Sequence, residues 1–126
     1  MSLILDSGAL IALERNERAM WRRFKAAALA GSLAVTHGGV LGQAWRGRGS
    51  RQALLAKALT GIDVRALDSA LGRAAGELLA ATGTADVIDA ALVLLAEDGD
   101  QIFTSDLGDI VTLAAAADRH VDVVRT

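Results

Sequence analysis

The stretch Leu3-Ile4-Leu5-Asp6-Ser7-Gly8 decides how this chain of 126 residues folds. Its three apolar residues predict a short buried strand, and Ser7 is expected to cap a helix that begins near Gly8. Asp6 then stands where the strand ends. Ligands of open α/β sheets bind outside the carboxyl ends of parallel strands, so Asp6 marks the edge of the sheet where a site is expected.

The rest of the chain alternates between short apolar runs and helical patterns. Four further strands are predicted, over Leu33–Thr36, Ile62–Val64, Gln101–Thr104 and Val121–Val124. Helices are predicted over Glu17–Ala30, Val40–Trp45, Ser50–Leu59, Asp68–Ala81, Thr84–Glu97 and Asp106–Ala117. This alternation predicts a single α/β domain over residues 1–126. It has three layers, α/β/α, around a short, mostly parallel five-stranded sheet of order 3-2-1-4-5.

The composition limits the class of function. Hydrophobic residues make up 52% of the chain and charged residues 22%, which argues against disorder. There is no cysteine, so disulfides and thiolate metal sites are excluded. The net charge of -2 does not attract nucleic acid as a whole, and 3% aromatic residues cannot support a binding mode based on base stacking. A polyanion would therefore have to bind through local basic patches and a bound metal.

The sequence also predicts a location. No apolar run approaches the roughly 18 residues that a membrane-spanning helix needs. The N-terminus has no basic segment and enters structure at once, so we expect no signal peptide, no membrane association and a cytoplasmic protein.

Two further aspartates resemble Asp6 in their placement. Asp106 follows the predicted strand Gln101–Thr104 at an interval of one residue, and Asp89 interrupts an otherwise apolar helix. In the predicted strand order, Asp6 and Asp106 lie on neighbouring strands, and Asp89 can return to the same edge. Carboxylates gathered there without a basic partner suit Mg²⁺ or Mn²⁺, which would polarise a scissile phosphate and lower the pKa of an attacking water.

Three segments in this order resemble the PIN-domain family, in particular its small VapC-type ribonuclease toxins. They are Leu5-Asp6-Ser7-Gly8-Ala9-Leu10, Val40-Leu41-Gly42-Gln43-Ala44-Trp45-Arg46, and Asp86-Val87-Ile88-Asp89-Ala90-Ala91 followed by Thr104-Ser105-Asp106. The resemblance covers the whole length. It implies an endoribonuclease that uses Mg²⁺ or Mn²⁺ to hydrolyse RNA phosphodiester bonds. It also implies the toxin of a type II toxin-antitoxin pair, with a small cognate antitoxin as partner and a homodimer as the expected assembly.

The resemblance assigns roles to residues of this chain. Asp6, Asp89 and Asp106 are expected to hold the metal, and whether one or two ions bind stays open. Supporting positions around them are Asp86, Asp109, Ser7 and Ser105.

Gln43 departs from the family pattern, which commonly has glutamate there. A glutamine can still bind a cation through its carbonyl oxygen or orient a water, but it cannot act as a general base. We therefore group Gln43 with the catalytic residues as a weak ligand, against the alternative that it only makes amide hydrogen bonds.

Other polar residues have less support. Arg46, Arg48 and Arg51 are candidate phosphate contacts for RNA, with a solvated loop as the alternative. A second cationic region on the first two helices, from Arg15 to Lys25, often faces the antitoxin in such proteins. His37 follows the second predicted strand and could approach the cleft, but we interpret it as a surface-loop histidine.

Two rival functions are open. The first is a catalytically degenerate PIN-like domain that binds RNA or a protein partner without cleaving, which only Gln43 favours. The second is a receiver-like domain, which would need a lysine after the last strand, and the last lysine of this chain is Lys57. The surviving aspartates favour the nuclease.

Overall fold

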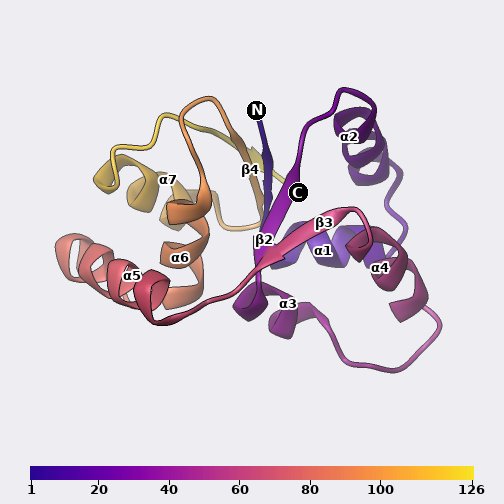
Figure 1. Cartoon of the computed structure of the whole chain (residues 1–126), viewed down its shortest axis with the longest axis horizontal. Coiled ribbons are helices and arrows are strands. Elements are labelled where there is room, and N and C mark those ends of the chain that lie inside the picture. Colours follow the sequence, from indigo (N-terminus) through magenta and orange to yellow (C-terminus); the bar gives the residue numbers. More distant parts are fainter.

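A fully parallel sheet of five short strands forms the centre of the computed structural model, which describes residues 1–126 (Figure 1). The strands are β1 (Leu3–Leu5), β2 (Ala34–His37), β3 (Ile62–Arg65), β4 (Gln101–Thr104) and β5 (Asp122–Arg125). Their order is β3-β2-β1-β4-β5, and all four pairings are parallel. The predicted fold class and strand order are therefore confirmed.

Strand β1 lies at the point where the order of the sheet changes direction. Leu3 pairs with Ala34 of β2 on one side and with Gln101 of β4 on the other. The chain leaves β1 toward β2 and later returns on the opposite side at β4, so the carboxyl ends of β1 and β4 border a topological switch point. Asp6 follows β1 directly at this edge.

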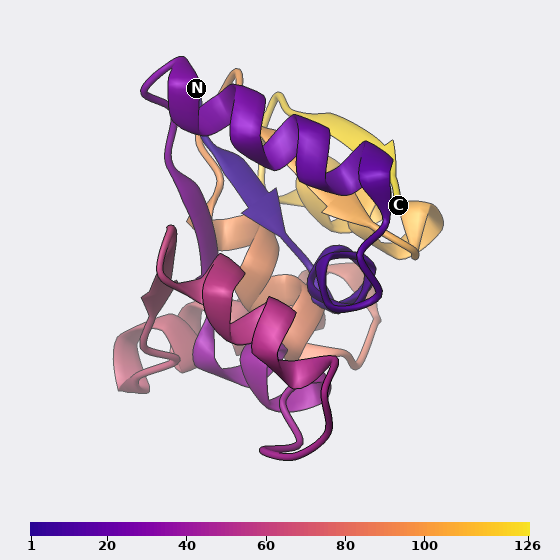
Figure 2. The same ribbon diagram turned by 90° about the vertical axis from the view of Figure 1, so that its right-hand side faces the viewer.

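Helices cover both faces of the sheet. One layer consists of α1 (Ser7–Glu14), α2 (Arg18–Leu29) and α4 (Gln52–Leu59). The other consists of α5 (Ser69–Thr82), α6 (Val87–Leu95) and α7 (Leu107–Ala116). Figure 1 shows these layers on opposite sides of the strands, and Figure 2 looks onto the layer that contains α2 and α4. The short helix α3 (Gly38–Ala44) begins where β2 ends.

Capping side chains set several helix starts that differ from the sequence prediction. The side chain of Asp6, not Ser7, caps α1. His37 caps α3 and starts it at Gly38 instead of Val40, and Asp86 caps α6 and starts it at Val87 instead of Thr84. Helix α4 starts at Gln52 without a side-chain cap from Ser50. The predicted cap of α5 by Asp68 is confirmed. A polar side chain that accepts from the first free N–H groups fixes the start of a helix more strongly than its apolar pattern does.

The core joins the sheet to the helix that carries Asp89. Ile4 and Leu5 of β1 are fully buried, as are all four residues Ala90–Val93 of α6. Burial of each large apolar side chain stabilises the fold by about 1.5–3 kcal/mol, so α6 is fixed between the sheet and the neighbouring helices α5 and α7.

The helices are short for crossing a membrane. No helix is on its own long and apolar enough to span one, and only α5 and α6 together reach that length and composition, with a bend of 110° between them.

Candidate metal centre

Asp6 is held rigidly at the end of β1. Its Oδ1 accepts a hydrogen bond from the backbone N–H of Ser7 at 2.7 Å, and its Oδ2 accepts one from the hydroxyl of Thr104 at 2.7 Å. Only 4% of the residue is exposed. Because each carboxylate oxygen already has a protein donor, Asp6 is both a helix cap and a buried anion beside the switch point of the sheet.

Asp89 lies in the first turn of α6 and has a different environment. The residue is 7% exposed, yet no protein group donates a hydrogen bond to its carboxylate oxygens; its backbone N–H donates to Asp86 Oδ1 at 3.1 Å. Burial raises the pKa of Asp89 to about 7, and the negative charges of Asp6, Asp86, Asp106 and Asp109 add to the effect. A buried carboxylate is costly when neither a hydrogen-bond donor nor a cation lies beside it, and Asp89 has neither in this structure.

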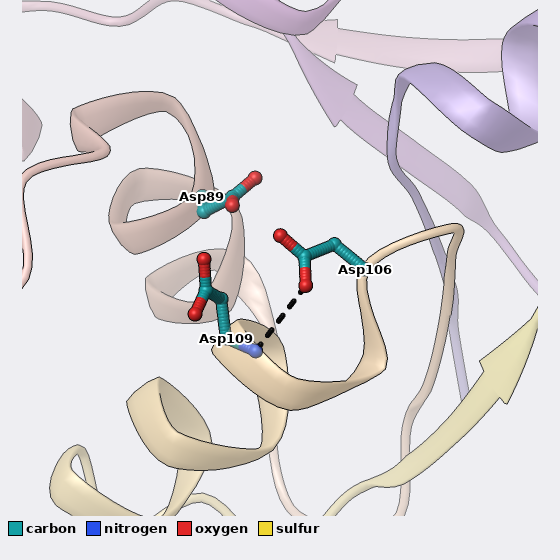
Figure 3. Close-up of side chains that lie close together, drawn as sticks. All are labelled: Asp89, Asp106 and Asp109. Carbon is teal, nitrogen blue, oxygen red and sulfur yellow. Dashed lines mark hydrogen bonds between the residues drawn. The ribbon is translucent and has the colours of Figure 1, made fainter.

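Asp106 and Asp109 come from the first turn of α7. Asp106 caps this helix, with its Oδ1 3.4 Å from the backbone N–H of Asp109 (Figure 3). The charge of Asp106 raises the pKa of Asp109, and a hydrogen bond between the two side chains adds to this effect. Both residues are exposed, so the solvent has access to this side of the cluster.

Three carboxylates meet between α6 and α7. One ligand oxygen each from Asp89, Asp106 and Asp109 can be chosen so that all three lie within 4.8 Å of one another, and Figure 3 shows these side chains converging from the two helices. We call this group the aspartate triad. The structure thus brings Asp89 and Asp106 together as predicted, adds Asp109, and leaves Asp6 outside the triad.

The triad fits a divalent cation of the Mg²⁺ or Mn²⁺ type. Every charge that acts on Asp89 is negative, and no lysine or arginine compensates it. Hard cations of this class prefer carboxylate oxygens, and the exposed side of the triad leaves room for water ligands. Asp6 and Asp86 contribute charge around the triad, Asp86 as the cap of α6.

None of the remaining predicted site residues forms a side-chain hydrogen bond with the triad. Gln43 is exposed on α3, and its side chain makes no hydrogen bond within the protein. The hydroxyls of Ser7 and Ser105 make none either, although α1 and Ser105 pack closely: a Cβ built on Gly8 would lie 3.0 Å from Ser105 Oγ. Their predicted roles stay predictions.

The arginine segment between α3 and α4 forms its own hollow. Arg46, Arg48 and Arg51 line it together with Glu14 and Gln52, and none of the cluster aspartates contributes to it. The guanidinium of Arg46 donates to the carbonyl oxygens of Gly42, Gln43 and Trp45 at 2.9–3.1 Å, so this side chain closes the end of α3. Arg48 and Arg51 are exposed.

The prediction that His37 is a surface-loop residue is wrong. His37 is the last residue of β2, is fully buried, and forms hydrogen bonds through both ring nitrogens. A histidine between β-branched residues and a glycine pair resembles a loop in sequence. Its burial depends on α6, which packs over the end of β2 from 51 residues away.

Comparisons with known proteins support the fold and nothing finer. No family model matches the sequence, and no curated protein matches it. Among solved structures, the chain is similar to one in the crystal structure of VapBC2 from Rickettsia felis bound to a DNA fragment from their promoter. The TM-score is 0.71 at 12% identity, over 98% of both chains. The PIN-like architecture predicted from the sequence is therefore confirmed at the level of the fold.

Proposed function

We propose that this protein is a Mg²⁺- or Mn²⁺-dependent endoribonuclease that hydrolyses RNA phosphodiester bonds. The observation that carries the proposal is the aspartate triad beside the carboxyl edge of a parallel sheet, with Asp89 buried and lacking any positive partner. Open α/β sheets place their sites at this edge. A cluster of carboxylates without histidine or cysteine suits phosphoryl chemistry supported by a hard cation.

The residues of the triad would contribute to different sides of the cation site. Asp89 supplies a buried carboxylate, and the neighbouring negative charges that raise its pKa would favour a cation bound beside it. Asp106 and Asp109 supply the solvent side, where a phosphate can approach. A bound cation would polarise the scissile phosphate and lower the pKa of an attacking water. Asp6, the first of the charges that act on Asp89, is a further carboxylate that we propose as a ligand of the cation, and it also fixes the start of α1.

The RNA would be held by local cations, because the net charge of the chain is -2. Arg48 and Arg51 are the free arginines of the α3–α4 segment and are our candidates for phosphate contacts. Arg46 can contribute only if its hydrogen bonds to α3 open.

A toxin role is the finer part of the proposal. We infer that the chain is the toxin of a toxin-antitoxin pair, that a small antitoxin neutralises it, and that it forms homodimers. The sequence resemblance and the structural likeness to VapBC2 support this inference. A cationic hollow between α2 and α4 offers a surface for an acidic partner segment; Arg18, Arg22, Lys25 and Lys57 line it beside Trp21, and none of these cations has an ion pair.

The direct test is cleavage of total structured RNA by the purified chain in Mn²⁺, in Mg²⁺ and in EDTA. We expect cuts that need the metal and that Asp89→Asn abolishes. Asp118→Asn is the matched control, because Asp118 is exposed, lies outside the triad, and has a φ of 54° that asparagine adopts readily.

The result also separates the nuclease from the alternative of a degenerate binding domain. Intact RNA under every metal condition, together with Mn²⁺ binding, would refute the nuclease and favour a domain that binds RNA or a partner without cleaving. Cleavage that persists in EDTA or in Asp89→Asn would refute the triad as its source.

A further inference from the structure

His37 connects three elements at the carboxyl edge of the sheet. Its Nε2 lies 2.9 Å from the carbonyl oxygen of Ile88, and its Nδ1 lies 3.1 Å from the backbone nitrogen of Gly39. A carbonyl oxygen only accepts and a backbone N–H only donates. The ring therefore accepts through Nδ1 and donates through Nε2, so both nitrogens are used: Nδ1 caps α3 and Nε2 holds the first turn of α6.

The contact with α6 is made next to the triad. Ile88 directly precedes Asp89, so the hydrogen bond from His37 fixes the peptide group that begins Asp89. The residues around this hydrogen bond are closely packed. A Cβ built on Gly39 would lie 2.5 Å from Ile88 Cδ1 and 2.9 Å from His37 Cε1, so the end of β2, the start of α3 and the first turn of α6 are in close contact.

The first turn of α6 needs such a tether. Four aspartates repel the carboxylate of Asp89, and two of them lie in the first turn of α7, which faces it. A helix end is also the part of a helix that frays most easily. Repulsion at a fraying end moves the carboxylate away from the other two, whereas a buried hydrogen bond from the rigid sheet opposes that movement.

We propose that His37 is a positioning residue that keeps the Asp89 carboxylate at ligand distance from Asp106 and Asp109. This inference rests on the proposed metal site and goes beyond it. It names a residue that touches neither the cation nor the substrate, yet determines how well the triad is organised before a cation binds.

Two variants separate the two hydrogen bonds of the ring. In His37→Gln the side-chain NH₂ reaches the position of Nε2, so the bond to Ile88 is retained and the cap of α3 is lost. In His37→Asn the side-chain oxygen reaches the position of Nδ1, so the cap is retained and the bond to Ile88 is lost. Asparagine is also a favoured N-cap residue, so the second variant is not handicapped in the stability of α3.

The measurement is the Mn²⁺ dissociation constant of each variant at pH 7.5, together with hydrogen exchange of the α6 amides. We expect His37→Asn to bind Mn²⁺ about tenfold more weakly or worse, the loss typical when a residue that orients a metal ligand is replaced. The amides of Asp89 and Ala90 should exchange faster in that variant. His37→Gln should stay closer to the wild type in both measurements, whatever its melting temperature.

Asp100→Ala controls for general destabilisation. Asp100 is also buried and also holds two backbone N–H groups, those of Ser2 and Glu97, but it lies before β4 at the opposite edge of the sheet. The Asp100→Ala substitution should lower the melting temperature and leave the Mn²⁺ affinity unchanged.

Equal Mn²⁺ affinity in the asparagine variant and the wild type would overturn the positioning role while the metal site stands. Equal losses of Mn²⁺ affinity in His37→Asn, His37→Gln and Asp100→Ala would show that His37 acts only through the stability of the fold. That result would also overturn the positioning role. A wild-type chain that binds no Mn²⁺ would refute the proposed function itself, and the positioning role with it.

Discussion

The hydroxyl of Thr104 donates a 2.7 Å hydrogen bond to Asp6 Oδ2, and both residues are buried. The same oxygen accepts a 3.0 Å hydrogen bond from the backbone N–H of Asp106. One side chain at the end of β4 therefore connects the acid after β1 to the start of α7. This connection fixes the relative position of the two strand ends that border the candidate metal centre.

Thr104→Val tests this connection, because valine keeps the shape and removes the hydroxyl. The substitution leaves one oxygen of the buried Asp6 carboxylate without a donor, which should lower the free energy of unfolding by about 1–3 kcal/mol. Urea unfolding at pH 7.5 measures the loss. Thr104→Ser keeps the hydroxyl and should lose less; a Thr104→Val variant as stable as the wild type would show that this hydrogen bond does not contribute to stability.

Asp89 makes stability depend on pH in an unusual direction. Its pKa is about 7 in the folded chain against an ordinary value of 3.8, so between these values the folded state holds a proton that the unfolded state has lost. Without metal, this group stabilises the fold most at low pH, and its contribution falls as pH rises from about 4 to about 7.

Asp89→Asn should therefore be more stable than the wild type at pH 7.5 in EDTA, and the difference should shrink toward pH 4.5. We expect about 1–2 kcal/mol at pH 7.5, a fraction of the full shift because the cluster is open to solvent on one side. Melting curves over this pH range measure it. A difference that does not change with pH, or that grows toward low pH, would contradict the raised pKa.

A divalent cation should offset the loss of stability that the charged Asp89 causes at pH 7.5. Mn²⁺ binds the folded triad and not the unfolded chain, so at pH 7.5 it should raise the melting temperature, by the equivalent of about 2.7 kcal/mol at a hundredfold excess over the dissociation constant. The rise should weaken below pH 7, because protonated Asp89 is a poor ligand.

Asp89→Asn should remove most of the rise, and Asp118→Asn should keep it. Thermal melting with a Mn²⁺ titration decides the matter. A wild-type chain with no metal-dependent rise would leave the aspartate triad without a cation.

The fold could be predicted from the sequence because its signals are local. Short apolar runs such as Leu3–Leu5 end at acids, and helical patterns separate them, which determines a parallel sheet. The helix starts were harder to predict. Asp6, His37 and Asp86 each cap a helix, and an acid or histidine at such a position reads equally well as a site residue or as a loop.

The site could be predicted only in part, because its geometry depends on contacts far apart in sequence. Asp89 and Asp106 were recognisable from their placement, and the structure brings them together. Asp109, three residues after Asp106, could equally have been an acid at the start of a helix. Only the packing of α7 against α6 brings both carboxylates to Asp89. The bond from His37 to Ile88 spans 51 residues and has no sequence signal.

The last prediction concerns whether Gln43 or Asp109 is the further ligand of the cation, beside Asp89 and Asp106. The side chain of Gln43 is exposed and makes no hydrogen bond, whereas Asp109 belongs to the triad. Asp109→Asn should therefore weaken Mn²⁺ binding by about tenfold, whereas Gln43→Ala should change it little.

Gln43→Glu should tighten Mn²⁺ binding if the end of α3 approaches the ion, because it adds a carboxylate ligand there. Calorimetric titration of the three variants with Mn²⁺ distinguishes the two residues. An unchanged affinity in both Gln43 variants would remove Gln43 from the site. A larger loss in Gln43→Ala than in Asp109→Asn would instead place the further ligand on α3 and contradict the triad.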